Sequence, residues 1–179
     1  MELLLAFSRF VDRITGGAGR AASVLVLLAT LVSVVNAVLR YGIGFGSNAW
    51  LEVQTHMFGA LMYLGGAHTL KVNEHIRVDV VYSTLRERTR MYIDVFGVLF
   101  FLLPVTVFMT WLSWSYFTGS FLSGEVSGNA GGLPLWPAKL TIPVGFALLT
   151  LQGLSELIKR IAALRGRMQL DVAYSKPDQ

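Results

Sequence analysis

The chain has 179 residues, of which 54% are hydrophobic and only 15% are charged, and its formal net charge is +4. This composition excludes an ordinary soluble domain, which needs more polar surface. The absence of cysteine excludes disulfides, iron–sulfur ligation and thiolate zinc sites. The basic residues flank apolar segments, a placement that argues for a membrane protein and against a nucleic-acid partner.

Residues 1–15 predict an amphipathic helix, in which apolar side chains recur at helical spacing and polar ones such as Ser8 and Asp12 occupy the opposite face. Such a helix is suited to lie in the cytoplasmic membrane interface. We expect the glycines at positions 16, 17 and 19 to end it. A signal peptide would have a shorter apolar region with a cleavage site after it, so we expect no cleavage.

Four apolar segments then predict four transmembrane helices, at about residues 20–40, 49–71, 91–117 and 138–160. A bilayer core roughly 30 Å thick needs about 20 such residues in a helix, and lipid offers the backbone no hydrogen-bond partners. The sequence therefore predicts an all-α integral membrane protein with one membrane domain over residues 1–166. The third segment is about 40 Å long, so we expect it to tilt or to kink at Pro104. The tail 167–179 is expected to be disordered.

The flanking charges predict the orientation. Only Arg40 and Lys139 lie on one side of the predicted spans, and the other 13 basic residues lie on the opposite side. The positive-inside rule then places both termini in the cytoplasm. The tryptophans agree, since Trp50 and Trp136 fall near outer span ends, where amphipathic rings favour the interface.

The second segment carries small residues that allow close helix packing, at Gly59, Gly65 and Gly66. In membranes such residues let backbones approach where hydrophobicity gives no drive for association. We therefore expect this helix to be the best packed of the four, and a bulky side chain at Gly65 or Gly66 to disrupt it.

The histidines suggest a haem site at first, but their positions argue against it. His56, His68 and His75 all lie in or just after the second segment. His56 and His68 are separated by about 120° around one helix and cannot hold one iron from both sides. A methionine such as Met109 is the remaining second ligand, so a haem-binding anchor subunit of a redox enzyme stays the alternative function.

No carboxylate lies at the centre of any predicted span. Glu52 sits at the outer end of the second span and Asp94 at the inner end of the third. Ion-coupled carriers usually place a carboxylate in mid-membrane despite its cost, and none is evident here. The expected partners are Arg40 or Lys139 for Glu52, and Arg90 or a neighbour for Asp94. A small exporter that works alone is a third hypothesis, weakened by the same absence.

Several segments resemble the small membrane subunit of tripartite ATP-independent periplasmic (TRAP) transporters, the DctQ-like family. They are Trp50–Glu52, Gly66–His68, Glu74–Asp79, Gly124–Ser127, Gly131–Lys139, Ile142–Phe146 and Leu151–Gly153. The resemblance covers roughly residues 20–160. One departure is Val53, since many relatives carry a second acidic residue there, which weakens any paired-carboxylate role.

The resemblance implies a non-enzymatic subunit of the bacterial inner membrane that braces a large transport subunit of about twelve spans. The large subunit would hold sodium and drive uptake of an organic acid, a carboxylate delivered by a periplasmic binding protein, so this chain would need no cofactor and no metal. The candidate interface or structural residues are Trp50, Glu52, Gly59, Gly65, Gly66, His68, His75, Arg77 and Asp79. Candidates for docking the binding protein are Glu125, Trp136 and Lys139, and lipids surround the spans.

Overall fold

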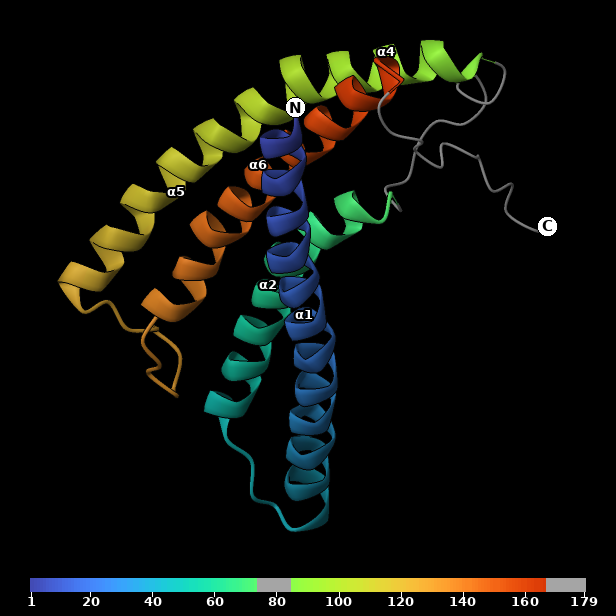
Figure 1. Cartoon of the computed structure of the whole chain (residues 1–179). Helices are drawn as coiled ribbons and strands as arrows, with labels where there is room; N and C mark the ends of the chain where they lie inside the picture. The colour runs from blue at the N-terminus through green and yellow to red at the C-terminus, as the bar shows by residue number, and fades with distance from the viewer. Residues whose placement is uncertain (74–84, 167–179) are drawn as a thin grey trace.

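A computed structural model of the chain describes residues 1–73 and 85–166, and the described part is built from helices. They are α1 (Glu2–Gly42), α2 (Asn48–Lys71), α4 (Glu87–Gly97), η1 (Val98–Leu102), α5 (Leu103–Ser123) and α6 (Trp136–Leu164). Figure 1 shows α2 beside α1, and α5 beside α6. The predicted tail, and the candidate residues His75, Arg77 and Asp79, lie outside the described residues.

Helix α1 is one continuous helix of 41 residues, so the expected break at the glycines between positions 16 and 19 is wrong. At 1.5 Å per residue it is about 60 Å long, twice the thickness of a bilayer core. Its first turns continue because one face, which carries Ser8, Val11 and Thr15, is buried. Ser8 is 2% exposed, whereas Leu3 and Phe10 on the apolar face are largely exposed. Ser8 and Asp12 of the predicted polar face therefore pack against α6, whereas Arg9 and Arg13 are exposed.

Three helical stretches are long and apolar enough to cross a membrane among the described residues: Glu2–Gly42, Arg88–Ser123 and Trp136–Leu164. The second predicted span is a helix of the expected length, since α2 covers Asn48–Lys71. The polar side chains of α2, however, lower its hydropathy, so α2 is not among the three stretches that are apolar enough to cross a membrane. Helix α2 packs against both α1 and α6, but α6 packs against α1, α2, α4, η1 and α5 and carries more buried residues. The expectation that the second span is the best packed is therefore wrong.

The third predicted span is confirmed as bent. Helix α4 leads into η1, a π-helical turn in which the Leu103 amide donates to the Val98 carbonyl five residues earlier. Pro104 follows directly and has no amide hydrogen, so the ordinary bond to the fourth residue back is missing there. Figure 1 shows the helix changing direction between α4 and α5. Helix α5 then runs to Ser123, which leaves a loop of residues 124–135, shorter than expected.

That loop is closed by its own hydrogen bonds. Val126 and Pro134 form an antiparallel bridge, and the Ser127 amide donates to the Leu133 carbonyl at 2.8 Å. Gly124 ends α5 in the left-handed conformation, with φ at +61°, which glycine adopts without steric cost. A Cβ at Gly131 would lie 2.7 Å from the Cα of Ala49, so the loop rests against the start of α2.

Of the three glycines expected to allow close helix packing, only Gly65 lies near another helix, and Gly145, which was not expected, allows a closer approach. A Cβ at Gly145 of α6 would lie 2.6 Å from the Cβ of Tyr63, and a Cβ at Gly65 would lie 3.8 Å from that of Ala22. A Cβ at Gly59 or Gly66 would meet no atom within 4 Å. The expectation that Gly66 packs tightly within this chain is therefore wrong, and the closest approach of α2 and α6 is at Gly145.

Candidate functional site

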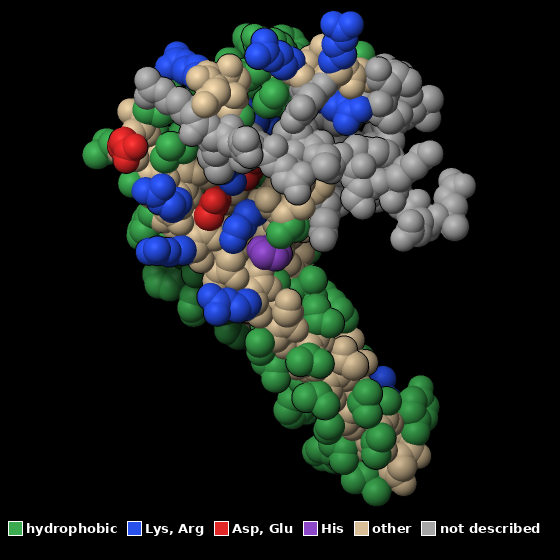
Figure 2. Space-filling model, turned by 45° about the vertical axis from the view of Figure 1, so that its right-hand side comes forward, with side chains coloured by type: hydrophobic (Ala, Val, Ile, Leu, Met, Phe, Trp, Pro, Cys, Tyr) green, Lys and Arg blue, Asp and Glu red, His purple; other side chains and the backbone are tan. Residues whose placement is uncertain are grey.

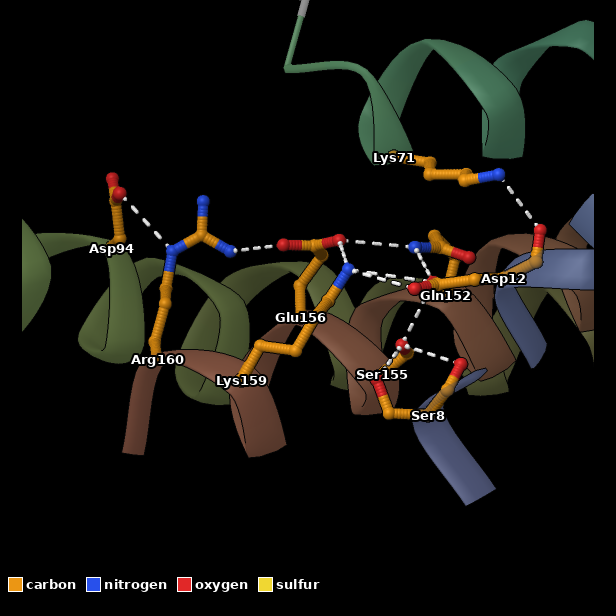
Figure 3. A network of polar contacts seen from close by, with 9 residues as sticks. All are labelled: Ser8, Asp12, Lys71, Asp94, Gln152, Ser155, Glu156, Lys159 and Arg160. Carbon is orange, nitrogen blue, oxygen red and sulfur yellow. Dashed lines mark hydrogen bonds and ion pairs between the residues drawn. The ribbon is translucent and has the colours of Figure 1, made fainter. Parts of the chain in front are cut away.

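Nine polar side chains form a network where the start of α1, the end of α2, α4 and the end of α6 meet (Figure 3). We call this set the ionic network and the part of the molecule around it the network end. Its members are Ser8, Asp12, Lys71, Asp94, Gln152, Ser155, Glu156, Lys159 and Arg160. Five of them recur on one face of α6, so this helix supplies the platform to which the others attach.

Asp12 joins α1 to α6. Its Oδ1 accepts hydrogen bonds from Gln152 Nε2 at 3.0 Å and from the Ser155 hydroxyl at 3.1 Å. Lys159 Nζ lies 3.3 Å from both of its carboxylate oxygens. The Asp12 carbonyl also accepts from Lys71 Nζ at 2.8 Å, which connects the end of α2. One turn of α1 is thereby bonded to two other helices.

Glu156 and Arg160 extend the network to α4. Glu156 pairs with Lys159 through one oxygen and accepts from Arg160 Nη1 at 2.8 Å through the other. Arg160 Nε donates to Asp94 Oδ2 at 3.1 Å. Asp94 thus pairs across helices with Arg160, a partner that lies far away in the sequence. The chain of contacts runs without interruption from α1 to α4.

The ionic network is balanced in charge and mostly buried. It contains three carboxylates and three cationic groups, and Glu156 and Arg160 are 7% and 8% exposed. Buried ions need partners because water no longer solvates them, and removal of one partner commonly costs about 3–5 kcal/mol. The arrangement suits a fixed junction between helices, since five of the six ions pair with an opposite charge and Lys71 donates to the Asp12 carbonyl. A group poised for proton transfer would instead need a free partner or access to water.

Basic side chains gather at the network end. Figure 2 shows Lys and Arg over this part of the surface, whereas the arm projecting from it is covered mostly by hydrophobic side chains. Large apolar residues on that arm and on α5, such as Leu31, Val38, Phe108 and Trp111, are more than half exposed. The molecule therefore has an apolar body with a basic end.

Two of the three predicted docking residues lie together at the opposite end. Lys139 forms an ion pair with Glu125, which holds the pKa of that carboxyl below its usual value of 4.5. Lys139 Nζ also lies 4.0 Å from the centre of the Tyr116 ring, and Trp136 meets Phe121 edge-on. These contacts fix the loop to α5 and α6. The docking role itself stays a prediction.

Glu52 lies in a cavity of about 420 Å³ at the same end, between the first turns of α2 and the loop 124–135. It is 7% exposed, and its Oε2 has no hydrogen-bond partner among the described residues. The expected ion pairs with Arg40 or Lys139 are wrong, because Arg40 donates to Asn48 at 3.2 Å and Lys139 pairs with Glu125. Trp50, two residues earlier, is about half exposed.

The two described histidines have separate surroundings on α2. His68 is packed against α1, since a Cβ at Gly19 would lie 2.4 Å from the His68 ring. His56 lines the Glu52 cavity. Neither faces a histidine on another described helix, so the geometry gives no support to a haem held by two histidines. The described residues also contain no cluster of three or more potential metal ligands.

The ionic network was not predicted from the sequence, although part of its signal is present. Ser8 and Asp12 lie four residues apart, as do Gln152, Glu156 and Arg160, so each set occupies one helical face. A polar stripe on a helix otherwise apolar enough to span a membrane indicates a buried partner. The pairing of the two stripes required the helix arrangement.

Comparison with known protein families places the chain. A family model described as "Tripartite ATP-independent periplasmic transporters, DctQ component" matches residues 29–163. That range contains α2, α4, η1, α5, the last third of α1 and nearly all of α6. Comparisons with curated proteins and with solved structures gave no match. The match covers well over half of the chain, and the chain therefore belongs to the DctQ family, the small membrane component of TRAP transporters, and is a transporter component rather than an enzyme.

Proposed function

We propose that the chain braces the large membrane subunit of a TRAP transporter during sodium-driven uptake of an organic acid delivered by a periplasmic binding protein. Family membership carries this proposal. The sodium coupling, the carboxylate substrate and the twelve or so spans of the large subunit rest on the family resemblance. The resident ion and the substrate belong to the partner subunits, and this chain supplies a scaffold.

The exposed apolar surface supports a bracing role. Of the 18 most apolar consecutive residues in the stretch Arg88–Ser123, only 6% are buried inside the chain. So much uncovered apolar surface requires lipid or another membrane protein around it. A groove of about 670 Å³ between η1 and α6 adds a concave apolar surface on the same side. A helix bundle this thin encloses little interior of its own, which fits a partner for a larger body.

The helix ends support four spans with both termini on one side. The start of α1 touches the end of α6, where the Ser8 and Ser155 hydroxyls are 2.6 Å apart. The end of α2 reaches the same place through Lys71. If α1 crosses the membrane, α2 must return across it to reach the network end, since its 24 residues are about 36 Å long. The basic network end is then cytoplasmic by the positive-inside rule.

The test of function is reconstitution. The chain is affinity-purified from membranes in mild detergent, and a stoichiometric large membrane subunit is expected with it. Proteoliposomes that contain both subunits and the binding protein should take up organic acid along a sodium gradient. Liposomes that lack only this chain should not. Recovery of the chain without a large membrane subunit contradicts the proposal.

The test of orientation uses the absence of cysteine, because any single introduced cysteine is a clean label site. Val126 lies in the loop before α6 and Arg165 follows the last residue of α6, and both side chains are exposed. When spheroplasts with an intact inner membrane are treated with an impermeant maleimide, Val126→Cys should react at once. Arg165→Cys should react only after permeabilisation. The reverse pattern, or labelling of both, refutes the proposed topology.

A further inference from the structure

The Glu52 cavity contains a buried carboxylate that has no counter-ion among the residues that the structure describes. Asn48, Glu52 and His56 are spaced four residues apart on α2, so they line one wall, and Ser127 and Asn129 of the loop lie opposite. None of the residues lining the cavity is Lys or Arg. The two nearest cationic candidates in sequence are engaged elsewhere, by Asn48 and by Glu125.

A buried, unpaired carboxylate is unfavourable in the chain alone. A charged oxygen that loses water without gaining a donor pays a desolvation cost of several kcal/mol. At the network end of the same molecule, five charged groups form ion pairs with one another. The contrast between the two ends indicates that the donor for Glu52 comes from outside the chain.

We propose that the Glu52 cavity is a socket for a lysine or arginine side chain of the large membrane subunit. The Glu52 carboxylate would accept its charged hydrogen bonds, and the polar groups of Asn48, Thr55 and Asn129 around it would accept or donate further ones. A cavity of this volume accommodates one long basic side chain with its guanidinium or ammonium group. This inference rests on the proposed function, because it assigns the partner to the large subunit.

A permanent partner fits this site better than a transient one. The binding protein is released in each transport cycle, and its departure would leave Glu52 bare and buried each time. A membrane subunit that stays bound keeps the carboxylate compensated throughout. The large subunit is therefore the occupant, and contact with the binding protein is an outcome for the test to detect.

The experiment compares Glu52→Gln with Glu2→Gln, the same change at the exposed start of α1. Each full-length variant is co-produced with the large subunit, and the affinity between the two is measured by titration in detergent. Glu52→Gln should weaken the affinity about tenfold, the effect of losing one charge-assisted hydrogen bond. Glu2→Gln should leave it unchanged. An unchanged affinity for Glu52→Gln overturns the socket.

A second readout separates a socket from a structural role. If Glu52 serves a partner, the full chain on its own should unfold at the same or a higher temperature with Gln at this position, because an uncompensated charge is gone. Lower stability, or failure of this variant to accumulate, overturns the proposal. Thermal stabilisation of the wild-type chain by sodium or calcium ions, abolished by Glu52→Gln, overturns it in favour of a metal site.

A photo-crosslinking residue at Thr55, on the cavity wall, identifies the occupant directly. It should crosslink to the large subunit, and Glu52→Gln should reduce the yield. Crosslinking to the binding protein instead overturns the assignment. The two proposals fail differently: if the wild-type chain retains the large subunit but these variants show no effect, only the socket is wrong. If the wild-type chain retains no large subunit, the proposed function fails.

Discussion

Glu156 is the centre of the ionic network, and its replacement by glutamine gives the sharpest test of what holds the helices together. Glu156 accepts from Gln152, Lys159 and Arg160, and its side chain is 9% exposed. Glutamine preserves the shape but removes the charge facing two cations. Loss of one member of a buried ion pair costs about 3–5 kcal/mol. Lys159 keeps Asp12 at 3.3 Å and Arg160 keeps Asp94 at 3.1 Å, so we expect the lower end, about 3 kcal/mol.

The assay is equilibrium unfolding of the purified full chain in mixed micelles, followed by circular dichroism. The matched control is Glu125→Gln, which breaks the ion pair with Lys139 at the other end. The Glu125 side chain is 41% exposed, so water screens that pair and the loss should be much smaller. A Glu156→Gln loss below about 1 kcal/mol, or no larger than that of the control, refutes the reasoning, because the network would then behave as surface charge.

Two further predictions concern α6 and the loop before it. Gly145→Ala should lower the free energy of unfolding by about 1–3 kcal/mol, because its Cβ would meet the Tyr63 backbone. Gly66→Ala should raise it by about 0.5–1 kcal/mol, because a Cβ there meets no atom and alanine favours the helix. Equal effects of the two substitutions in the same unfolding assay would contradict the packing. Glu125 has a lowered pKa because Lys139 bonds its charged form, so its contribution is present above the usual value of 4.5 and is lost as pH falls through the lowered value. In the wild type, Trp136 fluorescence should change at low pH as the Glu125–Lys139 ion pair is lost, and in Glu125→Gln this change should be absent. The same acid transition in the variant would contradict the assignment to Glu125.

The helical segments were predictable because each carries a long apolar run, and the α2 boundaries came out within one residue of those expected. The length of α1 was not, because local rules treat Gly16, Gly17 and Gly19 as breakers. Tertiary packing decided otherwise: the polar face before the glycines is bonded to α6, which holds that stretch in helical form. The kink before Pro104 was predictable since proline removes one specific hydrogen bond.

The candidate site was predictable in its residue types and less so in its pairings. Glu52 was predicted as a candidate interface or structural residue, but its expected partners were wrong, because proximity to a span end does not determine where a cationic side chain points. Asp94 and Arg160 are 66 residues apart, and nothing in their local sequence links them. The packing role of Gly145 was not predicted, because the small residues cluster on α2, whereas the contact depends equally on α6.

If the chain is a rigid brace, substitutions at its two ends should affect the affinity for the large subunit independently of each other. Glu52 and Lys71 are joined by nineteen residues of α2, about 28 Å of helix, and Glu156 lies beside the far end. Changes that far apart add in free energy to within about 0.3–0.5 kcal/mol when no element rearranges between them. The double variant Glu52→Gln, Glu156→Gln should therefore bind the large subunit with the sum of the two single effects. A significant departure from additivity shows that the bundle shifts between arrangements, in which case this chain takes part in the motion of its partner instead of holding it still.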